Sequence, residues 1–189
     1  MKGKLIIFSA PSGSGKTTLV RYLLEQNLNL AFSVSACSRE KRPYETEGKD
    51  YYFISESEFR DKIKNDEFVE WEEVYKNHLY GTLKTEIDRL WGKGMNVIFD
   101  VDVIGGMKIK KQYGSNALSI FVMPPSLEEL KRRLLGRSTE SMESLQLRIA
   151  KADDEMKFAD GFDFVLINDD LESAKKLAHS IVKNFLKVP

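Results

Sequence analysis

The sequence predicts an α/β fold in which a parallel sheet is flanked by helices and carries an inserted β-rich lobe and a lid. Short continuous apolar runs recur along the chain, and such runs are typical of strands that are buried on both faces. Helical patterns separate these runs, and strands that alternate with helices form parallel sheets. One long internal segment departs from this alternation, because its strand-like runs follow one another with a single small helix between them.

The first apolar run, Leu5–Phe8, is followed by a glycine- and serine-rich loop and then by a helix with leucines at positions 19, 23 and 24. Three later runs have the same character and predict further buried strands. They are Met95–Asp100, Ala117–Met123 and Phe162–Asp169.

Two predicted helices begin with a capping box, in which a serine precedes a glutamate by three residues. Ser126 and Glu129 begin a helix in the sheet region, and Ser55 and Glu58 begin the small helix of the inserted segment. Apolar residues three or four positions apart predict two more helices. These residues are Met142, Leu145, Ile149, Ala152 and Met156 in one, and Leu171, Ala174, Leu177, Ile181 and Phe185 in the other.

The inserted segment contains the strand-like stretches AFSVSACS, DYYFIS and EFVEWEEV. A polar stretch beginning at Gly136 lacks core residues and is typical of a flap. We therefore expect residues 1–189 to form a single domain with three parts: a core of residues 1–31, 92–135 and 149–189, a lobe of residues 32–91, and a lid of residues 136–148.

The composition bounds the function. Lysine plus arginine and aspartate plus glutamate both total 29 in 189 residues, so no global basic field favours nucleic acid or a membrane surface, and any anion site must be local. The single cysteine, Cys37, excludes an internal disulfide. No stretch resembles a signal peptide or reaches membrane-spanning length, so we expect a cytoplasmic protein. The sequence gives no indication of oligomeric state.

The loop SAPSGSGKT, Ser9–Thr17, nearly matches the phosphate-binding pattern G-x-x-x-x-G-K-[ST] of P-loop NTPases, with Ala10 in place of the first glycine. Alanine is acceptable there unless the position needs a positive φ. A surface turn is the alternative, but the preceding strand, the Lys-Thr pair and the following helix favour ATP binding. The expected ATP-binding residues here are Ala10, Pro11, Ser12, Gly13, Ser14, Gly15, Lys16, Thr17 and Thr18.

A second anion site is indicated by Arg39 and Arg42, three residues apart with Lys41 between them. Two guanidinium groups can hold one phosphate monoester through charge-assisted hydrogen bonds. A solvated charged stretch is the alternative on local grounds. The phosphate loop favours the site, because a phosphotransferase needs an acceptor phosphate. Tyr51 could add a hydroxyl to the same phosphate, although it could equally be a half-buried strand residue.

These motifs resemble the guanylate kinase family over nearly the whole chain. The resemblance rests on SAPSGSGKTTL, FSVSACSREKR, EGKDYYF, EFVEWEEV with LYGT, VIFDVDVIGG, VMPPSLEELKRRLLGRSTES and INDDL, in the family's order. It implies a P-loop core, an inserted nucleoside-monophosphate lobe and a lid, and transfer of the γ-phosphoryl group from ATP to GMP with Mg²⁺. Lys41 and Tyr44 depart from the family's arginine segment.

The resemblance also implies roles for individual residues. Those at GMP-site positions are Ser35, Arg39, Arg42, Tyr51, Glu70, Tyr80, Thr82 and Asp100. Arg137, Arg148 and Asn168 are at lid and adenine-side positions. The expected catalytic residues are Lys16, Arg39, Arg42, Arg137 and Arg148.

Guanine presents two adjacent donors, N1–H and the N2 amine, which one carboxylate can accept. Glu70 is the candidate, and Ser35 and Thr82 could donate to the base; the local alternative is a solvent-facing Glu70. Asp100 has two possible roles. It could accept the outer N2 proton of guanine, or it could support Mg²⁺, as a carboxylate at the end of a strand beside a phosphate loop does. Mg²⁺ is expected on Thr17 with support from Asp100 or Asp102.

Two other functions stay open at this point. A kinase for another nucleoside monophosphate would share the loop and the arginines, and a non-catalytic guanylate-kinase-like module would bind proteins instead. The choice between GMP and dGMP is also open.

Overall fold

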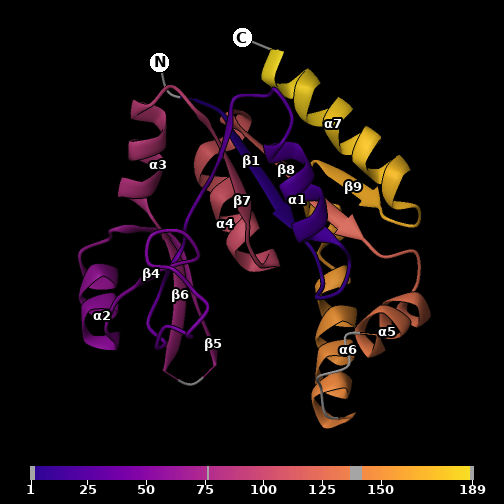
Figure 1. Ribbon diagram of the computed structural model, residues 1–189, viewed down its shortest axis with the longest axis horizontal. Coiled ribbons are helices and arrows are strands. Elements are labelled where there is room, and N and C mark those ends of the chain that lie inside the picture. Colours follow the sequence, from indigo (N-terminus) through magenta and orange to yellow (C-terminus); the bar gives the residue numbers. More distant parts are fainter. Residues whose placement is uncertain (1–2, 76, 137–141, 188–189) are drawn as a thin grey trace. The chain divides into compact units, whose positions relative to one another are not determined.

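The computed structural model describes residues 3–75, 77–136 and 142–187 (Figure 1). They fall into two compact units. One contains Lys4–Leu30 and the chain from Ile98 onward, and the other contains Ala31–Val97 together with Gly3.

Within the described ranges, the central sheet has five strands in the order β2-β7-β1-β8-β9. β1 pairs in parallel with β8, and β8 pairs in parallel with β9. The strands are β1 (Leu5–Ser9), β2 (Leu30–Phe32), β7 (Asn96–Asp100), β8 (Ala117–Met123) and β9 (Phe164–Ile167). All of β1 is buried, which confirms that its apolar run is a strand covered on both faces.

The last strand differs from its prediction in length and in burial. β9 begins at Phe164, because a 3-10 turn, η2 (Ala159–Gly161), precedes it and the Asp163 carboxylate accepts hydrogen bonds from Ser119. The side chains of Phe164 and Ile167 are exposed. The prediction of a fully buried strand was therefore wrong. β9 is an edge strand of its sheet, and its side chains are only partly covered.

Helices flank the sheet, as expected (Figure 1). α4 packs against β1 and β8, α1 packs against β1 and α7, and α7 packs against β9. Ser126 caps α5 by accepting the Glu129 N–H at 3.1 Å, which confirms the predicted start of this helix, while the Glu129 carboxylate accepts hydrogen bonds from Arg132 and Arg133. The helices are α1 (Lys16–Leu24), α4 (Val103–Tyr113), α5 (Leu127–Leu135), α6 (Met142–Met156) and α7 (Leu171–Lys187).

The unit Ala31–Val97 carries a mixed sheet, which among the described residues has the order β4-β3-β6-β5. β3 is parallel to β4 and antiparallel to β6, and β6 is antiparallel to β5. The Phe59 and Phe68 rings stack in its core, with their centroids 4.3 Å apart. Its elements are β3 (Ala36–Cys37), β4 (Tyr52–Phe53), α2 (Glu56–Lys64), β5 (Phe68–Tyr75), β6 (His78–Leu83) and α3 (Lys84–Gly92).

Two details of this unit differ from the sequence prediction. The run AFSVSACS divides into β2, which joins the central sheet, and β3, which joins the mixed sheet. The stretch 84–92, included in a β-rich segment, forms helix α3 because Ile87, Leu90 and Trp91 bury one helical face. The Ser55 cap on α2 is as predicted.

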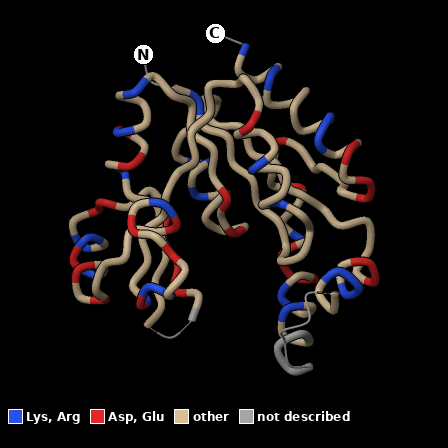
Figure 2. The backbone as a smooth tube through the Cα atoms, in the orientation of Figure 1, with Lys and Arg blue, Asp and Glu red and all other residues tan. Residues whose placement is uncertain are grey.

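Charges of both signs are interspersed along the described chain (Figure 2), in keeping with the equal totals of acidic and basic residues. Across the residues that the structure describes, no helix combines the length and the apolar character needed to span a bilayer.

Candidate active site

The loop between β1 and α1 has the backbone of a phosphate cradle. Gly13 and Gly15 have φ angles of 94° and 90°, a left-handed region that a side chain disfavours. Ala10 is not among the described residues with positive φ. Its Cβ is therefore compatible with the turn, and the departure from the phosphate-loop pattern leaves the loop's shape intact.

The first residues of α1 converge on the end of β7. The Lys16 Nζ lies 2.5 Å from Asp100 Oδ1 and donates to the Val101 carbonyl at 2.8 Å. The Thr17 hydroxyl donates to Asp100 Oδ2 at 2.8 Å. Asp100 thus holds both loop residues for which the sequence predicted a phosphate or metal role.

The second candidate carboxylate has a different role. Asp102 Oδ1 accepts the Gly105 N–H at 2.8 Å and caps α4. The structure therefore separates the two aspartates, which the sequence left open: Asp100 faces Lys16 and Thr17, and Asp102 stabilises a helix. The described residues contain no group of three or more metal-binding side chains. Thr17 and Asp100 supply the oxygen donors that Mg²⁺ prefers, and nucleotide phosphates and water would have to complete its coordination.

Two predicted ATP-side residues contact the loop directly. The Asn168 side chain is buried, and its amide nitrogen donates to the Ser14 carbonyl at 2.7 Å. Arg148, on α6, donates to the Ser12 hydroxyl at 3.2 Å. The remaining predicted member of this group, Arg137, lies outside the described residues.

Glu155, on α6, is a neighbour of the loop that the sequence reasoning missed. Burial raises the pKa of its carboxyl group, and the Lys16 and Lys151 ammonium groups oppose this rise. The Glu155 carboxylate lies 3.7 Å from the Lys151 Nζ. Its spacing on α6 is that of an ordinary surface ion pair, so the sequence contains no signal that could have identified it.

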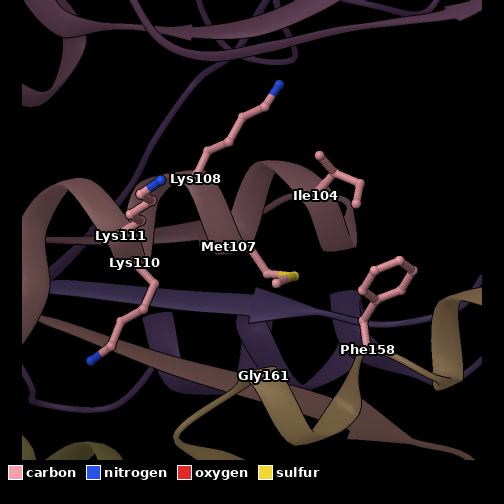
Figure 3. Close-up of a pocket in the computed structure, with 7 residues that line it drawn as sticks. All are labelled: Ile104, Met107, Lys108, Lys110, Lys111, Phe158 and Gly161. Carbon is pink, nitrogen blue, oxygen red and sulfur yellow. The ribbon is translucent and has the colours of Figure 1, made fainter.

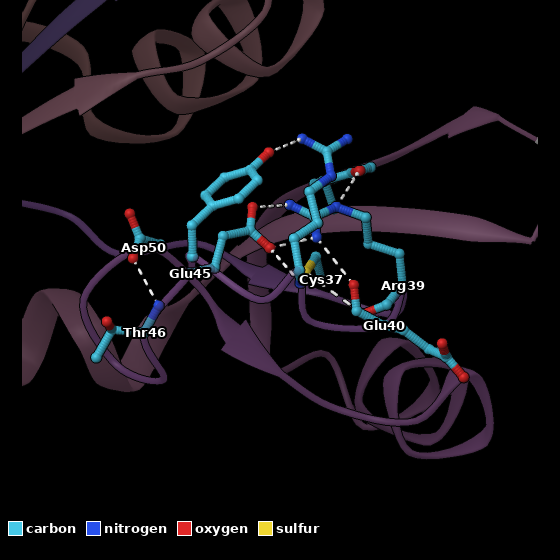
Figure 4. A network of polar contacts seen from close by, with 9 residues as sticks. Cys37, Arg39, Glu40, Glu45, Thr46 and Asp50 are labelled. Carbon is cyan, nitrogen blue, oxygen red and sulfur yellow. Dashed lines mark hydrogen bonds and ion pairs between the residues drawn. The ribbon is translucent and has the colours of Figure 1, made fainter.

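In the other unit, Arg39 lies at the centre of a polar network (Figure 4). Its guanidinium donates two hydrogen bonds to the Glu45 carboxylate, at 2.7 and 2.5 Å, and one to the Tyr80 hydroxyl at 3.1 Å. It also lies over the Tyr51 ring, 5.1 Å from the centroid. Three predicted GMP-site residues are thus brought together. Only 10% of the Arg39 side chain is exposed, so the alternative of a solvated stretch is wrong for this arginine.

Glu45 was also missed by the sequence reasoning, although its position three residues after Arg42 was a usable signal. The hydrogen bonds from Arg39 lower the pKa of Glu45 to about 2. Glu45 also accepts the Arg42 backbone N–H at 2.9 Å. The Arg42 side chain is exposed, and its guanidinium donates to the Tyr44 hydroxyl at 3.0 Å. The Glu45 carboxylate therefore holds the side chain of Arg39 and the backbone of Arg42.

The predicted base-reading residues form a buried pair. The Thr82 hydroxyl donates to Glu70 Oε1 at 2.7 Å, and the two residues are paired across β5 and β6. Glu70 is 5% exposed, so the solvent-facing alternative is wrong. Ser35 directly precedes β3, and its carbonyl accepts the N–H of Tyr52 on the neighbouring strand β4 at 2.9 Å.

Two other features contain no predicted site residue, namely a pocket along α4 and the thiol of Cys37. A pocket of about 380 Å³ lies along α4 and is lined by side chains that include Met107 and Phe158 (Figure 3). Lys110, which lines the pocket, forms an ion pair with Asp163, with 2.8 Å between Nζ and Oδ2. Burial raises the pKa of Cys37 to about 11, which makes its thiol inert, in keeping with a structural role.

Comparison with known proteins shows the family of this chain. A family model described as "Guanylate kinase" matches residues 2–185. The chain belongs to the guanylate kinase family. It is 59% identical over 186 residues to a guanylate kinase of Bacteroides thetaiotaomicron, covering 98% of this chain and 91% of the relative. It is 42% identical to that of Thermotoga maritima, covering 97% and 88%.

A solved structure supports the same family. The crystal structure of guanylate kinase from Anaplasma phagocytophilum matches with a TM-score of 0.77 and 30% identity, and the match covers 98% of this chain and 87% of that one. The predicted fold class and the family resemblance are therefore confirmed. The roles of individual residues stay predictions.

Proposed function

We propose that this chain transfers the γ-phosphoryl group of ATP to GMP and yields ADP and GDP, as an ATP:GMP phosphotransferase of purine nucleotide metabolism. The observation that carries the proposal is the phosphate loop in which Lys16 and Thr17 converge on Asp100. The names of the relatives agree with it. The single buried cysteine suits a reducing compartment, and we expect the enzyme to act in the cytoplasm.

On the donor side, the loop would cradle the ATP phosphates with its backbone N–H groups and the N-terminus of α1. Lys16 would neutralise the β- and γ-phosphates. Thr17 and Asp100 would hold Mg²⁺, which neutralises phosphate charge when it is bound. Lys16 would then exchange part of its contact with Asp100 for phosphate oxygens, since the ammonium group has three donors.

On the acceptor side, the hydrogen bonds of Arg39 explain why two arginines are needed. A guanidinium group has five N–H donors. Four of those of Arg39 engage Glu45 twice, the Glu40 carbonyl and the Tyr80 hydroxyl. Counting only contacts with described residues, one donor of Arg39 is left for the GMP phosphate, so the exposed Arg42 would supply further donors. Tyr51 would add its hydroxyl.

The buried Glu70 carboxylate would select guanine. Thr82 donates to Oε1 of Glu70 and helps to orient the carboxylate, which would accept the N1–H and N2–H donors of guanine when the base binds. Adenine has an acceptor at N1, which would face the carboxylate and leave buried polar groups unsatisfied. Such a mismatch can cost a factor of ~10⁴ in specificity.

The lid residues would act on the transferring group. Arg148, which contacts Ser12 of the loop, would neutralise charge that develops on the γ-phosphoryl oxygens, and Arg137 would assist it. An arginine in this role contributes about 10³ in rate. The phosphate oxygen of GMP is already a nucleophile, so no protein base is required.

The test is turnover with Mg-ATP on GMP, dGMP, AMP and UMP, with wild type, Glu70→Gln and Glu73→Gln. Glu73 follows Glu70 by an odd number of residues on β5, so its exposed side chain is on the opposite face of the strand. We expect wild type and Glu73→Gln to prefer GMP, and Glu70→Gln to lose about 10²-fold or more in kcat/KM for GMP.

The alternatives predict different results in the same panel. Comparable rates on AMP or UMP would support a kinase for another nucleoside monophosphate. An absence of turnover on all four nucleotides would support a non-catalytic protein-binding module. Comparing GMP with dGMP decides between those two acceptors.

A further inference from the structure

We infer that Asn168 is a positioning residue of the phosphate loop, and that it acts on the triphosphate through Ser14 and Gly15, whatever base the nucleotide carries. The inference rests on the proposed function, because it assumes that this loop binds the phosphates of ATP. It differs from the role implied by family resemblance, which is a contact on the adenine side.

The position of Asn168 is fixed by the central sheet. Its backbone N–H donates to the Met123 carbonyl at 2.8 Å, which continues the pairing of β8 with β9 by one residue. Its side-chain amide then donates to the Ser14 carbonyl at 2.7 Å. Asn168 is 3% exposed and Ser14 is fully buried, so this hydrogen bond is shielded from water. The hydrogen bond to β8 therefore fixes the position of Asn168, and its side-chain amide in turn fixes the Ser14 carbonyl of the loop.

This bond sets the direction of a phosphate-binding group. In a trans peptide the C=O and the following N–H point to opposite sides of one plane. The Ser14 carbonyl belongs to the same peptide unit as the Gly15 N–H. Because the Ser14 carbonyl points toward the Asn168 amide, the Gly15 N–H is directed away from Asn168.

The left-handed turn at Gly15 is matched to the same contact. A Cβ built on Gly15 would collide with the Asn168 amide nitrogen. The φ of Gly15 is 90°, and Gly15 is the N-cap of α1, directly before Lys16. The amide thus lies against the residue that turns the loop into the helix, and a change at Asn168 should alter the affinity for phosphate itself.

The experiment measures the binding of Mg²⁺-tripolyphosphate, Mg-ATP and GMP by calorimetry to wild type, Asn168→Asp and Asn168→Ala. Aspartate keeps the shape of the side chain but replaces the donor with an oxygen that repels the Ser14 carbonyl. We expect tripolyphosphate and ATP to bind about 10-fold or more weakly, by equal factors, and GMP to bind within about two-fold of wild type.

Asn184→Asp is the matched control, because it makes the same change at an exposed position of α7. It should bind all three ligands as wild type does. Urea unfolding of each variant is measured first, and the neutral alanine variant decides, because the negative charge of aspartate beside the loop would itself weaken phosphate binding.

Weaker binding of ATP with unchanged binding of tripolyphosphate would overturn the inference, because Asn168 would then act on the adenine base. Unchanged binding of both would also overturn it. The proposed function fails differently: wild type itself would then bind neither ATP nor tripolyphosphate, or would not phosphorylate GMP.

Discussion

Gly15→Ala tests how the phosphate loop is held. The substitution adds one methyl group at a residue with a φ of 90°, and this methyl group would collide with the Asn168 amide that donates to Ser14. The variant therefore combines a backbone cost with the loss of one buried hydrogen bond.

The magnitude follows from these two terms. An L-residue in the left-handed region costs about 1–2 kcal/mol. A buried polar group left without its partner costs about 1–3 kcal/mol. Alanine also restricts the unfolded chain, which offsets about 0.5–1 kcal/mol. We expect the free energy of unfolding to fall by about 1–4 kcal/mol in total.

The assay is urea unfolding with linear extrapolation, and two other glycines separate the terms. Gly94 has a φ of 72° with nothing within 4 Å of an added Cβ, so Gly94→Ala carries the backbone cost alone. Gly92 ends α3 in equally open space without a positive φ, so Gly92→Ala should be neutral or stabilise by about 1 kcal/mol or less.

The decisive quantity is the difference between Gly15→Ala and Gly94→Ala, which we expect to be about 1–3 kcal/mol. A difference below about 0.5 kcal/mol, with Mg²⁺-tripolyphosphate binding unchanged, would refute the claim that Asn168 and Gly15 are packed as a unit.

Two predictions concern charge. Lys16→Met removes the ammonium group that lies 2.5 Å from Asp100, and we expect kcat to fall by about 10²-fold or more while the unfolding curve changes little; retention of a tenth of the activity would contradict the role of Lys16. Arg39 lowers the pKa of Glu45 from 4.5 to about 2, so the unfolded state binds more protons between these values and the stability contributed by the pair is lost as the pH falls through this window. Urea unfolding from about pH 5 to about pH 3 should therefore show a shallower loss for Glu45→Gln than for wild type, and equal slopes would contradict the pairing.

Much of the fold could be predicted from the sequence because its signals are local. Ser55 and Ser126 cap two helices at the predicted starts, and the continuous apolar run at β1 is a strand buried on both faces. The exposure of Phe164 could not be predicted, since it depends on the order of strands in the sheet. α3 was missed because its burial depends on packing within its unit.

The candidate site also has parts that the local sequence predicts and parts that depend on the fold. The phosphate loop could be predicted because its chemistry needs neighbouring residues in a fixed order. Asn168 and Ser14 are far apart in the sequence, and the pairing of β8 with both β1 and β9 brings them together. The bidentate contact of Glu45 with Arg39 depends likewise on the path of a loop that departs from the family's pattern at Lys41 and Tyr44.

The central claim is that a phosphoryl group passes directly from ATP to GMP, and label transfer from [γ-³²P]ATP with Mg²⁺ tests it most directly. We expect the label to appear in GDP only when GMP is present, with little in inorganic phosphate and none on the protein. Label that is released as inorganic phosphate whether or not GMP is present, or that stays on the chain, would contradict it.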